Sequence, residues 1–397
     1  MKTTHHLQRL RPVLPVVVAV LVLCGPYAQG QVDLSRDLET IRTNRHMPGL
    51  SALVLKQGHI LAQGAAGFRR QGQREPLLVT DRINIASCTK WMTATLAGRL
   101  VDRGLIGWDT RVCELFTHHP AFNPAFTNAT LDQLLSHRSG VQQNGTFTAR
   151  HASRFLLQTG SLPQLRRWVS EAVLADPPEV PPGSFLYANQ GYTVAAAMLE
   201  LATGKDWETL MKEELFIPLR MTSASLGIVY DNVLPPQAPV GHVLAPGKTV
   251  PLPCPAVGTN EHVHSQAAVG PGGYVACTLQ DWAKFLHLHV AAGHDGYLTA
   301  ATARRLRRSY VGEEGYGRGI LVCQRGWAEP GPALTHGGDI FGHNTVVWMA
   351  PARDFIIVVF TNCRSADKSS AQARDDVASL LVRRYKDAVV AGPLLEN

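Results

Sequence analysis

The sequence predicts an α/β fold, in which an antiparallel sheet is built from both ends of the chain and covered by helices on both faces. Three observations lead to this expectation. Pairs of apolar runs separated by turn residues occur near both ends, the run Phe355–Phe360 is continuous rather than alternating, and helical patterns dominate the stretch between. A continuous apolar run is typical of a strand that is buried on both sides. We therefore expect a mainly helical region inserted into a sheet-forming part.

The expected domain covers residues 31–390 and follows a signal segment at residues 1–30. Its α/β part comprises about 31–86 and 270–390, and its helical part about 87–269. The chain has 397 residues, of which 45% are hydrophobic and 17% charged. This composition provides a large core and excludes a disordered or low-complexity chain.

Residues 1–30 resemble a secretory signal peptide. The apolar run from Val13 to Cys24 is shorter than the roughly 20 residues of a membrane span, and Ala28-Gln29-Gly30 has the small-x-small pattern of a cleavage site. Three basic residues and no acidic one occur in this segment: Lys2, Arg9 and Arg11. We expect an exported protein, periplasmic or extracellular. An uncleaved anchor and a lipid attached at Cys24 remain as alternatives.

The first elements after the signal segment are a helix and a hairpin. Asp33 to Arg45 is predicted to be an amphipathic helix, because Leu34, Leu38 and Ile41 repeat at helical spacing. Leu50–Leu55 and His59–Gly67 are apolar runs joined by a turn at residues 57–58, so they predict two paired strands.

The helical part follows. Five segments carry helical patterns and are linked by proline-rich loops: Lys90–Arg103, Leu131–Ser136, Leu162–Leu174, Tyr192–Thr203 and Trp207–Leu215. Near the other end, Thr345–Ala350 and Phe355–Thr361 form a second predicted hairpin, and Asp367–Tyr385 a helix. The helices at 33–45 and 367–385 are the expected covers of the sheet.

Charge and cysteine content exclude several classes of protein. The net charge is +7, and three of these charges belong to the signal segment. The remaining basic residues form short pairs such as Arg304-Arg305, so we expect no nucleic-acid partner. Six cysteines follow the signal segment, enough for one or two disulfides in an exported protein, and no Cys-x-x-Cys occurs.

Ser87-x-x-Lys90 is the first candidate for chemistry. On a helix this spacing places the hydroxyl and the amine on one face. A serine is a weak nucleophile until a base removes its proton, and lysine serves as that base only when burial or a neighbouring charge keeps it neutral. The apolar helix after Lys90 predicts this burial. Ser365-x-x-Lys368 has the same spacing, but its polar surroundings indicate a solvated helix start.

Two further patterns accompany this pair. Tyr187-x-Asn189 places a phenol and an amide at a loop-to-helix turn, where the phenol could assist the lysine. Tyr230-x-Asn232 repeats the spacing in a proline-rich stretch, and a structural tyrosine is the alternative for both. His336-Gly337-Gly338-Asp339 lies before the second hairpin, where glycines let a strand approach a ligand and a backbone N–H near Asp339 could face an oxyanion.

The three patterns in this order resemble the active-site set of the class C β-lactamase-like serine hydrolases, within the penicillin-binding protein superfamily. Three linking segments are similar as well: Leu134–Gly140, Phe185–Tyr192 and Gly270–Tyr274. The resemblance runs from about Leu34 to Tyr385. It implies a β-lactamase/transpeptidase-like fold, no metal or other cofactor, and a small-molecule or short peptide substrate.

The resemblance also implies roles for individual residues. Ser87 would form the acyl-enzyme, Lys90 and Tyr187 would share the acid–base work, and Asn189 would bind the substrate amide. The backbone N–H groups of Ser87 and Asp339 would form the oxyanion hole. His336 and Gly338 stand where many relatives have Lys-Thr-Gly, so a fixed charge for a substrate carboxylate is missing. Amide, ester and D-amino-acid peptide bonds are therefore expected substrates ahead of β-lactams.

Three other functions are compared with this one. A metal hydrolase is suggested by His262-Val263-His264, which would point both rings to one face of a strand. No third ligand has a suitable spacing, and His287 and His289 would diverge on a helical stretch. An α/β-hydrolase is excluded because no Gly-x-Ser-x-Gly occurs. A penicillin-binding sensor that is acylated without turnover keeps the same residues and remains an alternative.

Overall fold

The computed structural model describes residues 31–390, apart from 118–121, 156, 230–233, 235, 246–247, 253–266, 291–295 and 311–314. The predicted signal segment lies outside the described residues, so the signal peptide and export stay predictions. Within the described ranges, no helix combines the length and the apolar character that crossing a bilayer requires.

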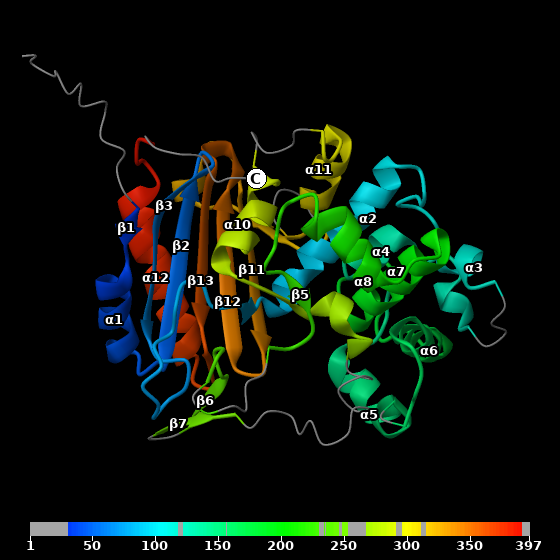
Figure 1. Cartoon of the computed structure of the whole chain (residues 1–397). Helices are drawn as coiled ribbons and strands as arrows, with labels where there is room; N and C mark the ends of the chain where they lie inside the picture. Colours follow the sequence, from blue (N-terminus) through cyan, green and yellow to red (C-terminus); the bar gives the residue numbers. More distant parts are fainter. Residues whose placement is uncertain are drawn as a thin grey trace, which may run out of the picture.

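The central sheet of the described residues joins the two ends of the chain (Figure 1). Its strand order is β1-β3-β2-β13-β12-β11-β10-β9, and all neighbours are antiparallel except β1 and β3. The N-terminal hairpin meets the C-terminal hairpin where β2 pairs with β13. The strands are β1 Val32–Asp33, β2 Gly49–Lys56, β3 His59–Gly67, β9 Gly315–Tyr316, β10 Leu321–Cys323, β11 Ala333–Ile340, β12 His343–Ala350 and β13 Phe355–Thr361. Both predicted hairpins are confirmed.

Strand β13 is buried along its whole length, as its continuous apolar run predicts. Its side chains alternate between two cores. Ile357 and Val359 pack in a cluster with α1 (Ser35–Asn44) and α12 (Ser369–Tyr385). Ile356 and Val358 belong to the larger cluster, which includes α10 (Leu279–His287) and the helical region.

The two helices expected to cover the sheet lie on the same face, side by side (Figure 1). Ion pairs Arg45–Asp376 at 2.7 Å and Arg384–Asp37 at 2.6 Å join them. The other face is covered by α10 and α2, so the sheet has helices on both sides, as predicted, but from other segments than the expected pair. Amphipathic patterns show that a helix covers a sheet and leave the choice of face open.

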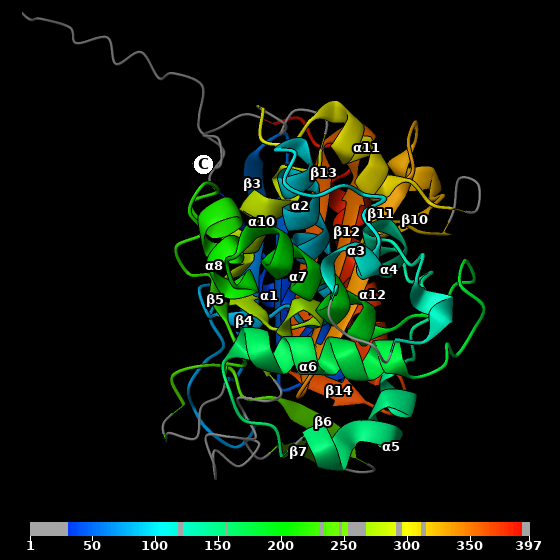
Figure 2. The ribbon, with the colours of Figure 1, turned by 90° about the vertical axis from the view of Figure 1, so that its right-hand side faces the viewer.

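The helical region lies beside the sheet, and Figure 2 shows α6, α7 and α2 in front of the strands. Its helices are α2 Thr89–Asp102, α3 Val112–Leu115, α4 Leu131–Leu135, α5 Asn144–Phe155, α6 Leu162–Ala175, α7 Asn189–Thr203 and α8 Trp207–Met211. The fifth predicted helix ends differently, because α8 continues as a π-helical turn, Lys212–Phe216. Helix α5 was not predicted, because its Gly145, Thr146 and Thr148 have low helix propensity. The exact boundaries of the two parts stay predictions.

Two small sheets and one further helix complete the described fold. Strand β4 (Ile83–Asn84) pairs with β8 (Val275–Cys277), which pairs with β5 (Ser225–Leu226). A second sheet has the order β14-β6-β7, with β14 Cys363–Ser365, β6 His242–Ala245 and β7 Lys248–Pro251. Helix α11 is Ala300–Arg307. The five described cysteines that follow the signal segment are free thiols: Cys88, Cys113, Cys277, Cys323 and Cys363. Cys254 lies outside the described residues.

Candidate active site

Ser87 lies in a tight turn, Ala86–Cys88, between β4 and the start of α2. Strand β11 passes directly against this turn. A Cβ atom added at Gly338 would lie 2.5 Å from the carbonyl oxygen of Ile85 and 2.8 Å from the Cβ of Ala86. Only glycine fits at position 338, because any side chain would push the strand away from the turn. Gly338 therefore brings the backbone of β11 next to Ser87.

Lys90 is fully buried one helical turn after Ser87. Its Nζ lies 3.1 Å from Ser87 Oγ and donates a hydrogen bond of 2.6 Å to the carbonyl of Gly272. The rings of Tyr187 and Tyr192 lie 5.0 and 5.6 Å from the amine. Burial lowers the pKa of Lys90 to about 7, because the charged form loses its hydration. A large fraction of the amine is therefore neutral near neutral pH.

The segment that carries Gly272 is tied to α2 by two threonines. Thr93 Oγ1 donates to the carbonyl of Pro271 at 2.8 Å, and Thr89 Oγ1 accepts from the N–H of Val275 at 3.1 Å. Helix α2 thus carries Lys90 and also fixes the position of the segment whose Gly272 carbonyl accepts from the Lys90 amine. Most of α2 is buried, which keeps water away from the amine.

Tyr187 ends the loop before α7 and reaches Ser87 from a distant part of the chain. Desolvation raises the pKa of its hydroxyl, and a hydrogen bond with the Ser87 side chain acts in the opposite direction. The residue as a whole remains 37% exposed. Ser87, Lys90 and Tyr187 thus form one cluster, although Ser87 and Tyr187 are 100 residues apart along the chain.

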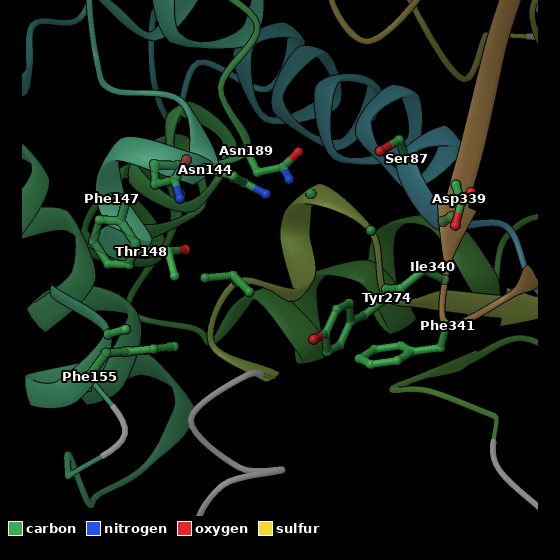
Figure 3. A pocket seen from close by; sticks show the side chains of 16 residues that line it. Ser87, Asn144, Phe147, Thr148, Phe155, Asn189, Tyr274, Asp339, Ile340 and Phe341 are labelled. Atoms are coloured by element: carbon green, nitrogen blue, oxygen red, sulfur yellow. The ribbon is translucent and has the colours of Figure 1, made fainter. Parts of the chain in front are cut away.

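A cavity of about 460 Å³ opens beside Ser87 (Figure 3). Asn189, at the start of α7, and Asp339, on β11, line it together with Ser87. The Oδ1 atom of Asn189 is buried without a partner in the protein. Asn344 Nδ2 donates a hydrogen bond of 3.1 Å to Asp339 Oδ2, so one oxygen of this carboxylate is bonded to the neighbouring strand β12.

His336 is placed differently from the other predicted residues. It is 8% exposed and is not among the residues that line the cavity. Its Nδ1 lies 2.6 Å from the carbonyl of Gly337, which only accepts, so Nδ1 carries the proton. Its Nε2 then accepts from Tyr316 Oη at 2.9 Å. Burial, aided by Lys90, lowers the pKa of His336 to about 4, so the ring is neutral at neutral pH.

His137 was not predicted as a site residue, yet its ring contacts those of Tyr187, Tyr192 and Tyr316. Its Nδ1 accepts from the N–H of Ala188 at 3.1 Å, and its ring centre is 4.2 Å from that of Tyr187. The segment Leu134–Gly140 was noted only as part of the resemblance. In the structure, the backbone of His137 also stands out, because its φ of +59° is uncommon for residues other than glycine.

The predicted metal alternatives are not brought together in the described part of the chain, where no three His, Cys, Asp or Glu side chains could hold an ion. His262 and His264 lie outside the described residues. His287 faces Asp354 at 3.7 Å, and His289 contacts Thr95 at 3.1 Å. The absence of a cofactor stays a prediction.

Curated relatives of this chain include penicillin-binding and peptidase proteins. It is 27% identical to "Penicillin-binding protein 4" of Amycolatopsis lactamdurans over 82% of this chain and 83% of that protein. It is 28% identical to a "D-aminopeptidase" of Cereibacter sphaeroides over 49% of this chain, but spans only 36% of that protein.

Solved structures and a family model agree on the fold. One similar solved structure is the D-amino acid amidase from Ochrobactrum anthropi SV3 complexed with L-phenylalanine amide. Its match to this chain has a TM-score of 0.65 and 19% sequence identity, and it covers 88% of this chain and 96% of the amidase. The family model described as Beta-lactamase matches residues 34–381. The chain therefore belongs to the Beta-lactamase family of serine hydrolases.

Proposed function

We propose that this protein is an exported hydrolase that cleaves amide, ester or D-amino-acid peptide bonds through an acyl-enzyme on Ser87. The observation that carries the proposal is the 3.1 Å separation between Ser87 Oγ and the buried, desolvated amine of Lys90. Neutral lysine beside a serine is the arrangement that activates this nucleophile.

Acylation begins with the neutral amine of Lys90. One of its N–H groups donates to the carbonyl of Gly272, which leaves the nitrogen lone pair for the hydroxyl of Ser87. As Oγ bonds to the substrate carbonyl carbon, its proton passes to Lys90 and the carbonyl oxygen gains the negative charge. The N–H groups of Ser87 and Asp339 are proposed to hold that oxyanion.

Release of the leaving group needs a proton on its nitrogen or oxygen. Tyr187 contacts Ser87 and lies beside Lys90, so we assign it to relay the proton from the ammonium to the leaving group. The bond to the leaving group breaks and the acyl group remains on Oγ. A water molecule, deprotonated by the same pair, then attacks the ester carbonyl carbon. The bond from that carbon to Oγ breaks, Oγ takes the proton back from the pair, and the acid product leaves.

Asn189 is proposed to bind the substrate amide. Its buried Oδ1 has no partner within the protein, and the side chain lines the cavity next to Ser87. An amide N–H of the substrate would satisfy this oxygen.

Slow turnover of β-lactams is part of the proposal. A carboxylate next to the scissile bond needs a positive partner, whereas His336 is neutral and both of its ring nitrogens contact protein atoms. The role of His336 that the geometry supports is to hold Tyr316, with substrate contact restricted to its backbone.

Covalent labelling tests the mechanism. The protein is incubated with a fluorescent penicillin or an aryl ester and digested, and the labelled peptide is identified by mass spectrometry. Acyl mass on the peptide that contains Ser87, absent in a folded Ser87→Ala variant, is expected. A folded protein that turns over substrate without this label would contradict the proposal.

Two outcomes would support the alternatives instead. Slow labelling with no product release would indicate a penicillin-binding sensor. Activity that survives Ser87→Ala and is lost with a chelator would indicate a metal hydrolase. Export is tested separately, by sequencing the mature N-terminus, which we expect to begin near residue 31.

A further inference from the structure

Helix α5 turns one face toward the cavity beside Ser87. Five of its residues line the cavity at helical spacings of three or four: Asn144, Phe147, Thr148, Ala152 and Phe155. Figure 3 shows Phe147 and Phe155 at the end of the cavity away from Ser87. The hydrophobic part of this face has no assigned role in the chemistry described above.

The two phenylalanines that line the cavity, Phe147 and Phe155, are held in place by contacts within α5 and with α6. Phe155 stacks on Trp168 of α6 with 6.0 Å between ring centres and 17° between ring planes. Phe147 meets Phe155 edge to face at 6.1 Å. His151, on the next turn, contacts Asp176 at 2.8 Å beyond the end of α6. Because these contacts hold the helix against α6, the apolar face is formed before any ligand arrives.

The remaining lining residues bring polar and apolar groups together, because Ile340 and Phe341 follow Asp339 on the same side of the cavity (Figure 3). Ser87, Asn189 and Asp339 supply polar groups near the nucleophile, whereas Tyr274, Ile340 and Phe341 add apolar surface. No lysine or arginine occurs among the described residues that line it. Asp339 would repel an anionic group that entered.

The size of the cavity suits a ring. A dry protein cavity of about 150 Å³ holds benzene, so a cavity of about 460 Å³ has room for a phenyl group and the atoms that link it to the scissile carbonyl. Burial of that ring would stabilise the bound acyl group through the hydrophobic effect.

We infer that this cavity binds the side chain of the acyl group and that the face of α5 makes the enzyme select large, uncharged apolar side chains. Aromatic acyl groups are the expected substrate class, and acyl groups with a carboxylate are rejected. This inference rests on the proposed function, because it takes Ser87 as the acylated residue.

The test compares three p-nitrophenyl esters that differ only in the acyl group: acetate, 3-phenylpropionate and the half-ester of succinate. The unmodified protein is expected to hydrolyse the phenylpropionate with a kcat/KM roughly tenfold to hundredfold above that of the acetate. The succinate ester should fall below the phenylpropionate by at least about tenfold.

Two variants of α5 test whether this helix is responsible for the preference for the phenylpropionate ester over the acetate ester. Ala152→Trp fills the cavity and should lower the ratio of phenylpropionate to acetate kcat/KM at least about tenfold. Ala149→Trp places the same ring on the exposed side of the same helix and should leave the ratio unchanged. Ala152→Leu is the milder variant if the first does not fold, as judged by circular dichroism.

The outcomes separate the two proposals. Equal kcat/KM for acetate and phenylpropionate in the unmodified protein, or an equal loss for both esters in Ala152→Trp, would overturn the assignment of α5 while leaving Ser87 as nucleophile. Failure of the folded protein to hydrolyse or become acylated by any of the three esters would contradict the proposed function itself, and the inference with it.

Discussion

The chain contains two Ser-x-x-Lys patterns, and their surroundings are opposite. Lys90 is 0% exposed and lies 3.1 Å from Ser87 Oγ. Lys368 is exposed, and the hydroxyl of Ser365 instead accepts from the N–H of Ser370 at 2.8 Å, at the start of α12. The same spacing thus gives a buried serine–lysine contact in one place and a helix start in the other.

The difference is one of backbone conformation and burial. Ser87 immediately precedes α2, so the helical backbone places the side chain of Lys90, three residues later, on the same face as the serine. Lys368 precedes α12 with φ +67°, outside the helical conformation. Two lysines at equal spacing therefore differ in whether their amine is taken out of water, which is what decides basicity.

The largest expected effect comes from the two serines. Ser87→Ala should lower kcat/KM by at least about a thousandfold, because the nucleophile is lost. Ser365→Ala should change it less than about twofold. Ester hydrolysis assays on both folded variants check this, and comparable losses in the two would remove the distinction between the sites.

The two lysines should differ by a smaller but still large factor. Lys90→Met keeps the volume of the buried side chain and removes the base, so kcat/KM should fall about 10²- to 10⁴-fold. Lys368→Met is the matched control and should be near normal. A Lys90→Met enzyme that retains most of its activity would show that another group removes the proton from Ser87.

The pH dependence separates the two lysines as well. Burial lowers the pKa of Lys90 to about 7, so the active neutral amine accumulates as pH rises and kcat/KM should increase through about pH 7. Lys368→Met should leave that limb of the profile in place. Activity that is flat from pH 5 to 9, measured with an ester whose background hydrolysis is subtracted, would be inconsistent with this assignment.

The same pKa shift has a consequence for stability. Unfolded lysine titrates near pH 10.4, so between about pH 7 and that value the unfolded chain binds the proton that folded Lys90 has lost. Stability should therefore rise with pH in this window, by up to about 1.4 kcal/mol per unit. In Lys90→Met this contribution disappears, which urea unfolding at several pH values would measure as a smaller slope.

The smallest effect concerns how α2 positions the amine. Thr93 holds the carbonyl of Pro271, next to the Gly272 carbonyl that binds Lys90, whereas Thr95 donates to Trp91 within its own helix. Thr93→Val should lower kcat/KM about threefold to tenfold by loosening Gly272, and Thr95→Val should have less effect. Equal effects of the two variants on activity, at equal melting temperatures, would argue against this positioning role.

Much of the fold could be predicted from local patterns. The paired apolar runs at both ends predicted β2–β3 and β12–β13, and the unbroken run 355–360 predicted a strand buried on both faces. Helix α5 was missed because its glycine and threonines lower the helix propensity, and its aromatic face is explained by packing against α6.

The site, too, combines features that local patterns predicted with features that depend on packing. The order and spacing of Ser87, Lys90 and Tyr187 could be found by inspection of the chain, as could the glycine at position 338. Their patterns could not show that His336 is engaged by Tyr316 or that His137 packs on Tyr187. Those contacts depend on which rings meet in the core.

The sequence by itself thus determined the strand pairs, the helix that follows Ser87 and the residue types available for the proposed acyl transfer, since these depend on neighbours a few positions apart. The apolar helix after Lys90 predicted that this lysine is buried, but only the tertiary structure decided which groups surround its amine. The partner of the Lys90 amine, the carbonyl of Gly272, is 182 residues away along the chain. Desolvation and hydrogen bonding between such distant segments arise from the packing of the whole domain, and no local pattern specifies them.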